Sequence, residues 1–122
     1  FTCSRQDPHF KEMRNVGKKG EYAYCNRNVA KQLKAEVYDV YGIPTNERKN
    51  YNIDHIIALS IGGNNSPHNL WPEHQCIQHA RNNWEYQIHL RLLNNQITHE
   101  QAIEEIYQVK YNPSITYAGC QY

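Results

Sequence analysis

The stretch NIDHIIALSIGGNNSPHNLWPE, residues 52–73, decides the fold of this chain. Apolar residues alternate with more polar ones from Tyr51 to Leu59, which predicts a strand. Gly, Asn, Ser and Pro residues cluster from Gly62 to Pro67 and predict a wide loop. Asn69 to Trp71 then predicts a short return strand. The stretch as a whole therefore predicts a β-hairpin.

Helical patterns follow and precede this hairpin. Apolar residues recur at steps of three and four, which predicts helices over residues 28–41, 75–93 and 98–110. Asn28 is the expected N-cap of the first helix. Thr98, with Gln101 three residues later, has the form of a capping box at the start of the last helix. The order of strands and helices predicts a small α+β protein.

The N-terminal part of the chain has no sustained periodicity of apolar residues. We expect residues 1–27 to form an irregular basic arm, with a short strand near Glu21 to Tyr24. Residues 1–34 carry a net charge of +5 and the rest of the chain carries −4, so the arm could meet a polyanion. Solvated surface lysines are an equally good interpretation of the charge alone.

Composition limits the class of protein. A chain of 122 residues with 39% hydrophobic residues suits one domain, residues 1–122. The apolar runs are only a few residues long, whereas a membrane span needs about 20, so we expect no membrane partner. The net charge of +1 gives no global basic field.

Cysteines occur at Cys3, Cys25, Cys76 and Cys120, without the Cys-x-x-Cys pairs of structural zinc sites. An even number in a small chain predicts two disulfides, and three pairings remain open. The chain begins at Phe1, as it would after removal of a signal peptide. These features together predict an oxidising location, either secreted or periplasmic.

The ordered combination of Asp54-His55, Gly62-Gly63-x-Asn and Asn69-Leu-Trp-Pro resembles the HNH, or ββα-metal, endonuclease superfamily over residues 52–89. The resemblance implies a hairpin-and-helix core over residues 51–93. It also implies divalent-metal-dependent hydrolysis of DNA, with RNA as an alternative substrate.

The chemistry of such a site explains why these residue types are needed. A base must take a proton from water, and a cation must neutralise the charge that grows on the phosphate. His55 suits the base because an imidazole is often neutral near physiological pH. Asp54, which by resemblance is a metal ligand, offers the hard oxygen that Mg²⁺ or Mn²⁺ prefers. Neighbouring residues of a regular strand point to opposite faces, however, so a shared phosphate requires a distorted strand.

The resemblance also assigns supporting roles. The third metal ligand is His79 or, if the segment before it holds an insertion, Asn82 one turn further along. Asn69 is expected to brace the hairpin loop beside the base, and Glu85 to hold a partner near the site. Candidate phosphate-binding residues are Arg81, Arg48 and Arg27.

We see no base-reading module in the sequence, so cleavage should depend little on the DNA sequence. We expect a monomer that uses Mg²⁺, with Mn²⁺ or Zn²⁺ as alternatives. Two other functions stay open. One is an exported toxin nuclease with an immunity protein, and the other is a non-catalytic module in which His68, His74 and His79 bind zinc.

Overall fold

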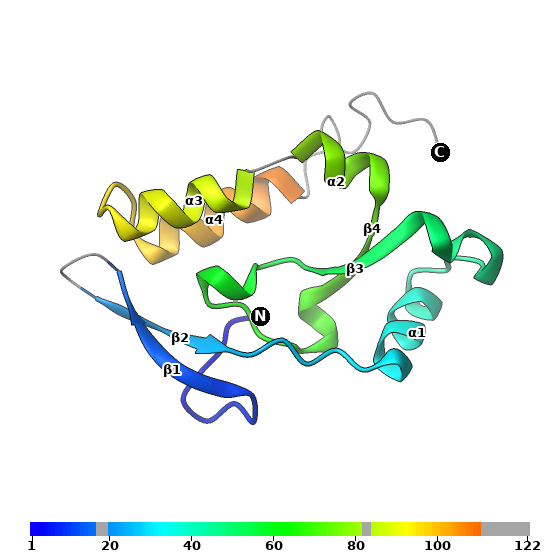
Figure 1. Cartoon of the computed structure of the whole chain (residues 1–122), viewed down its shortest axis with the longest axis horizontal. Helices are drawn as coiled ribbons and strands as arrows, with labels where there is room; N and C mark the ends of the chain where they lie inside the picture. The colour runs from blue at the N-terminus through cyan, green and yellow to red at the C-terminus, as the bar shows by residue number, and fades with distance from the viewer. Residues whose placement is uncertain (17–19, 82–83, 111–122) are drawn as a thin grey trace.

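The structure is a computed structural model that describes residues 1–16, 20–81 and 84–110 (Figure 1). The described elements are β1 (Phe10–Asn15), β2 (Glu21–Cys25), α1 (Lys31–Val40), β3 (Tyr51–His55), β4 (Leu70–His74), α2 (Gln75–Arg81), α3 (Trp84–Leu93) and α4 (His99–Lys110). Within these residues the strands form two small antiparallel sheets, β1–β2 and β3–β4. The expected α+β class is confirmed, together with a disulfide between Cys3 and Cys25.

The N-terminal arm is not irregular as expected, because β1 and β2 form a hairpin within it. Phe10 pairs with Cys25 and Asn15 with Glu21, with a register shift near Phe10. The sequence of β1, FKEMRN, is mostly polar and half-exposed, so alternation between a core face and a solvent face was not visible. The predicted strand near Glu21 to Tyr24 is confirmed as β2. Tyr22 of this strand is buried, and its hydroxyl donates a hydrogen bond to the carbonyl of Ser60.

The predicted hairpin of residues 52–73 is present, but its first strand ends earlier than predicted. β3 pairs with β4 in an unbroken register from Tyr51 opposite His74 to His55 opposite Leu70. The residues after His55 remain apolar because they are buried: Ile56, Ile57 and Ile61 are each at most 3% exposed. They enter a loop with a 3₁₀ turn at Leu59–Ile61 instead of extending the strand.

The helices agree with the predicted positions, with differences at their ends. α1 begins at Lys31 after Ala30, which supplies no side-chain cap, so the expected cap at Asn28 is wrong. The capping box is confirmed: the Thr98 amide donates to Gln101 Oε1, and the Gln101 amide donates to Thr98 Oγ1. The single helix predicted over residues 75–93 is described as α2 and α3, and residues 82–83 between them lie outside the described part.

Two apolar clusters lie on either side of the β3–β4 hairpin. One joins β2, the 3₁₀ turn, α3 and α4 through buried residues that include Tyr22, Ile61, Ile88 and Ile106. The other joins α1 to the hairpin through Val37, Ile53 and Leu70. Figure 1 shows α3 beside α4 on one side of the hairpin and α1 on the other. α1 therefore packs against the β3–β4 hairpin, whereas α3 and α4 pack against the loop that follows β3.

None of the described helices combines the length and the apolar composition that crossing a bilayer requires. Cys76 is also disulfide-bonded, and none of the described cysteines is free. Cys120 lies outside the described residues.

Candidate functional site

His55, the last residue of β3, is buried but surrounded by polar groups. Its side chain is on the same face of the strand as Ile53, and the residue is 3% exposed. Its Nε2 lies 3.0 Å from Asn65 Oδ1 and its Nδ1 lies 3.4 Å from an Arg27 guanidinium nitrogen. The ring is thus fixed by partners from two other segments of the chain.

These partners define the tautomer of His55. A guanidinium can only donate hydrogen bonds, so Nδ1 of His55 must be the acceptor nitrogen. Nε2 then carries the hydrogen and donates it to the amide oxygen of Asn65. Burial lowers the pKa of His55 below its usual value of 6.5, an effect that the bond to Asn65 opposes. His55 is therefore a neutral imidazole whose basic nitrogen faces Arg27.

Asn65 connects the hairpin loop to the segment between β2 and α1. Its Oδ1 accepts a hydrogen bond from the Asn28 amide at 3.1 Å, and its Nδ2 donates to the Asn26 carbonyl at 2.6 Å. Arg27 lies between these two backbone contacts. The same amide therefore holds the His55 ring and the backbone on both sides of Arg27.

Asn69 braces the loop from its other end. This fully buried side chain accepts a hydrogen bond from the Ile57 amide at 2.9 Å and donates to the carbonyls of Ile57 and Asn64. The side chain of Asn69 thereby joins the parts of the loop that precede and follow the two glycines. Asn69 acts on the backbone that follows His55, where it binds the amides of Ile56 and Ile57.

Asp54 faces the opposite side of β3. Its Oδ2 lies 3.6 Å from Nζ of Lys110, the last residue of α4. The same ammonium lies 2.5 Å from Glu85 Oε1 and donates a 2.5 Å hydrogen bond to the carbonyl of His55. Because the β3–β4 register is unbroken, Asp54 and His55 point to opposite faces, as a regular strand requires.

The oxygens around Lys110 suit a hard divalent cation. Two carboxylates and one carbonyl, from Asp54, Glu85 and His55, converge on a single cationic atom. Carboxylate and carbonyl oxygens are the ligands that Mg²⁺ and Mn²⁺ prefer. The donor chemistry of this site therefore fits the metal that the sequence predicts, and the Lys110 ammonium lies where those oxygens meet.

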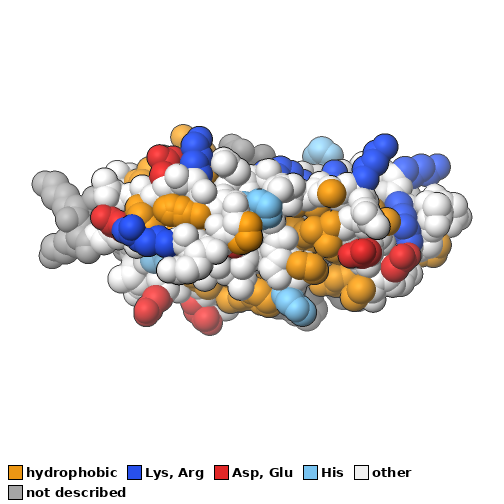
Figure 2. All heavy atoms as spheres, turned by 90° about the horizontal axis from the view of Figure 1, so that it is seen from below, with side chains coloured by type: hydrophobic (Ala, Val, Ile, Leu, Met, Phe, Trp, Pro, Cys, Tyr) orange, Lys and Arg blue, Asp and Glu red, His pale blue; other side chains and the backbone are white. Residues whose placement is uncertain are grey.

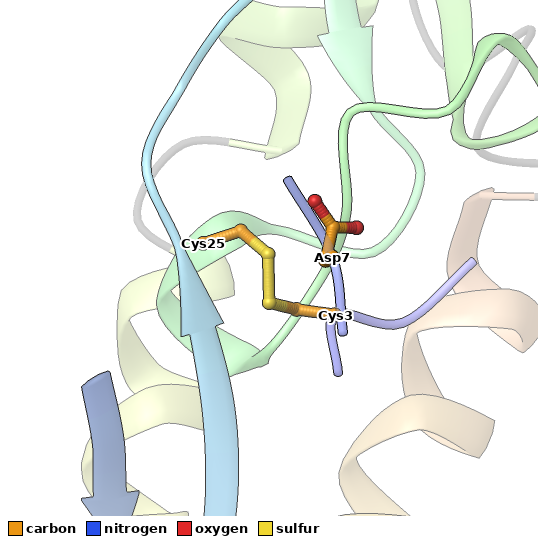
Figure 3. Close-up of side chains that lie close together, drawn as sticks. All are labelled: Cys3, Asp7 and Cys25. Carbon is orange, nitrogen blue, oxygen red and sulfur yellow. A yellow bond between two sulfur atoms is a disulfide. The ribbon is translucent and has the colours of Figure 1, made fainter. Parts of the chain in front are cut away.

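A second group of possible metal ligands lies at the N-terminus. Cys3, Asp7 and Cys25 bring ligand atoms within 4.8 Å of one another, the one such trio of His, Cys, Asp or Glu side chains within the described residues. Figure 3 shows that a disulfide joins the two sulfurs beside the Asp7 carboxylate. Two bonded sulfurs offer no thiolate, so this group is a structural crosslink in the oxidised protein.

The other predicted site residues are spread over the molecule. Arg48 donates to Asp39 at 2.7 Å and stacks over Tyr38, away from the contacts of His55. His79 is exposed on α2. The side chain of Arg81 and all of Asn82 lie outside the described part of the chain.

The three histidines of the zinc alternative are all described, and their ring nitrogens do not lie within ligand distance of one another. His74 accepts a hydrogen bond from the Cys76 amide, and its ring packs on the edge of Tyr51. His68 is exposed in the hairpin loop.

Two residues of the site received no role from the sequence. Asn65 is the asparagine of the Gly-Gly-x-Asn pattern, so the signal was present without a function attached to it. Lys110 follows Ala102 and Ile106 at steps of four, which places it on the buried face of α4. A lysine that continues the apolar positions of a helix is the sequence feature that could have predicted a buried cation.

The chain matches no family model, no curated protein and no solved structure.

Proposed function

We propose that this protein is a secreted or periplasmic nuclease of the ββα-metal type that hydrolyses phosphodiester bonds of DNA, with RNA as an alternative substrate. The sequence pattern of residues 52–73 and the order β3, β4, α2 support the proposal. The disulfides agree with an oxidising location. The observation that carries the proposal is the His55–Arg27 pair, a neutral imidazole whose acceptor nitrogen faces an exposed guanidinium.

The proposed reaction begins when a substrate phosphate attracts the Arg27 guanidinium. A guanidinium binds two phosphate oxygens better than one imidazole nitrogen, so Arg27 leaves Nδ1 of His55. The space between them then admits a water molecule. This exchange opens the buried ring to solvent only when a phosphate is present.

His55 next acts as the general base. The water donates a hydrogen bond to Nδ1, and its oxygen attacks phosphorus while the proton passes to the imidazole. Asn65 keeps the other nitrogen protonated, so Nδ1 is always the basic one. The bond from phosphorus to the departing 3′-oxygen breaks. A divalent ion held by Asp54 would neutralise the charge on the phosphoryl and leaving oxygens. Because the side chains of Asp54 and His55 point to opposite faces of β3, this step requires the strand to distort at these two residues when the substrate binds.

The test is a plasmid-nicking assay with Mg²⁺, with and without EDTA. His55→Ala should lower the nicking rate by about 100-fold or more, because a general base contributes at least that factor. His9→Ala, at a histidine that has no role in the proposal, is the matched control. Circular dichroism should show that both variants keep the fold.

Full nicking activity in a folded His55→Ala variant would refute the assigned base. A wild-type protein that leaves plasmid DNA and RNA intact with Mg²⁺, Mn²⁺ and Zn²⁺ would refute the proposed function.

A further inference from the structure

Lys110 is an unusually buried cation. The residue is 6% exposed and its side chain only 1%, whereas lysines are almost never fully buried unless they are paired. Its partners are Asp54 on β3, Glu85 on α3 and the carbonyl of His55. Residues of β3, α3 and α4 thus meet at one ammonium.

The location of this ammonium matters because Asp54 is the proposed metal ligand. Nζ lies 3.6 Å from Asp54 Oδ2 and 2.5 Å from Glu85 Oε1. Two cations cannot share these oxygens at such distances without strong repulsion. A divalent ion placed where these oxygens meet must therefore displace Lys110 from Asp54 and Glu85.

We infer that Lys110 is a built-in cation that competes with a divalent metal ion for Asp54, Glu85 and the carbonyl of His55. The inference rests on the proposed function for the identity of Asp54 as a ligand, and it adds Glu85 and the His55 carbonyl to the ligand set. Metal-free protein keeps its carboxylates neutralised through Lys110. Metal binding exchanges one cation for another, so wild-type affinity is weaker than the ligand set alone would give.

Displacement of Lys110 by a metal ion would also affect His55, the proposed base. Lys110 donates to the carbonyl of His55, so its departure changes the backbone contact of the residue that carries the basic imidazole. Metal loading and the position of β3 at His55 are coupled through this one side chain.

Binding of Mn²⁺, measured by electron paramagnetic resonance without nucleic acid, tests the inference. Lys110→Met removes the charge and keeps an apolar chain of similar length. We expect it to bind Mn²⁺ about tenfold more tightly than wild type, or better, because the competing charge is gone. Lys31→Met, at an exposed lysine of α1, makes the same change in net charge and should bind like wild type.

Two further variants distinguish the effect of the charge of Lys110 from the effect of its size. Lys110→Arg keeps the cation and should show no gain in Mn²⁺ affinity. The double variant Asp54→Asn with Lys110→Met should lose the gain. The melting temperature of Lys110→Met should also rise more on Mn²⁺ addition than that of wild type, because the ion binds the folded state.

An unchanged affinity in Lys110→Met, or a gain that survives Asp54→Asn, overturns the inference. If Lys110→Met does not fold without metal, Lys110→Gln, which keeps a donor group without the charge, takes the same measurements and is judged by the same outcomes. These results are independent of the nicking assay. Tighter Mn²⁺ binding by the variant together with a silent nicking assay would retain the cation site and reject the nuclease.

Discussion

The environment of His55 determines how this side chain titrates. Burial lowers its pKa, and the positive charges of Arg27 and Lys110 act in the same direction, whereas Asn65 and Asp54 act in the opposite direction. The folded protein therefore binds this proton less readily than the unfolded chain. The resulting contribution to stability is complete above the unfolded value of 6.5 and is lost as the pH falls below it. Above pH 6.5 this imidazole is therefore mostly neutral.

Asn65 controls which nitrogen of His55 is basic, and its substitution tests that role. Asn65→Ala removes the acceptor for Nε2–H and the contacts to Asn26 and Asn28. We expect the nicking rate to fall by about 10- to 100-fold, as for other residues that orient a reacting group. The measurement is the nicking rate as a function of pH.

Asn65→Asp separates positioning from simple stabilisation of the fold. A carboxylate beside Nε2 raises the pKa of His55, so the acid limb of the pH–rate profile should move to higher pH. Ser66→Ala, next to Asn65 in the loop, should leave the position of that limb unchanged. An acid limb at the wild-type pH in a folded Asn65→Asp protein would contradict the role of Asn65.

At the scale of elements, the hairpin loop depends on two neighbouring glycines for different reasons. Gly62 has a φ of +93°, a conformation that side chains with a Cβ rarely adopt. Gly63 has no such φ, but a Cβ built on it would lie 1.8 Å from the carbonyl oxygen of Ile57. The second glycine is thus required by the close approach of Gly63 to the backbone of Ile57 and Ala58.

Gly63→Ala should therefore push apart the segment that Asn69 holds together. We expect the free energy of unfolding to fall by about 1–3 kcal/mol, the usual range for an overpacked site. Urea unfolding followed by circular dichroism gives the value. Gly20→Ala is the control, since its Cβ would meet Val16 at 3.9 Å, an ordinary contact. Equal stability of the two variants would show that the loop adapts to the added methyl group.

Elements with a strong local signal were predictable from the sequence, and elements defined by distant contacts were not. The capping box at Thr98 and the turn chemistry of the hairpin are encoded within a few residues. The end of β3 at His55 depends instead on Asn69, whose backbone and side chain bind the amides of Ile56 and Ile57. The apolar run beyond His55 has the same composition in a strand and in a buried loop.

In the candidate site, too, the residues of the local motif were predictable and their distant contacts were not. The motif pointed to His55, Asp54 and Asn69 as residues, and the roles of Asp54 and His55 as ligand and base remain proposals. The contacts of His55 with Arg27 and of Asp54 with Lys110 join segments 28 and 56 residues apart. Such contacts leave no periodic pattern in the sequence of a single helix or strand, because they depend on how the elements pack against one another.

At the scale of the whole molecule, charge gives little long-range attraction for a polyanion. The net charge is +1. On the face shown in Figure 2, the described Lys and Arg side chains are interspersed with Asp and Glu side chains and with apolar patches. Binding of a nucleic acid would therefore depend on local contacts, and Arg27 beside His55 is the contact that we propose.

The N-terminus holds Arg27 in place through a chain of contacts that begins at the disulfide. Cys3 is bonded to Cys25, two residues before Arg27. The Cys3 amide donates to the carbonyl of Gly62, and Thr2 forms a β-bridge with Gly63. The first residues of the chain thereby connect β2 to the hairpin loop that carries Asn65.

Removal of this crosslink should therefore affect both stability and catalysis. The double variant Cys3→Ser with Cys25→Ser should lose about 3 kcal/mol of unfolding free energy, the value expected for a loop of this length. It should also nick DNA more slowly at temperatures where it is folded, because Arg27 is no longer held beside Nδ1 of His55. Urea unfolding and the nicking rate measure the two effects, and the variant leaves the disulfide at Cys76 intact, as a reducing agent would not. A folded double variant that nicks at the wild-type rate would show that the disulfide is not needed to hold Arg27 beside His55.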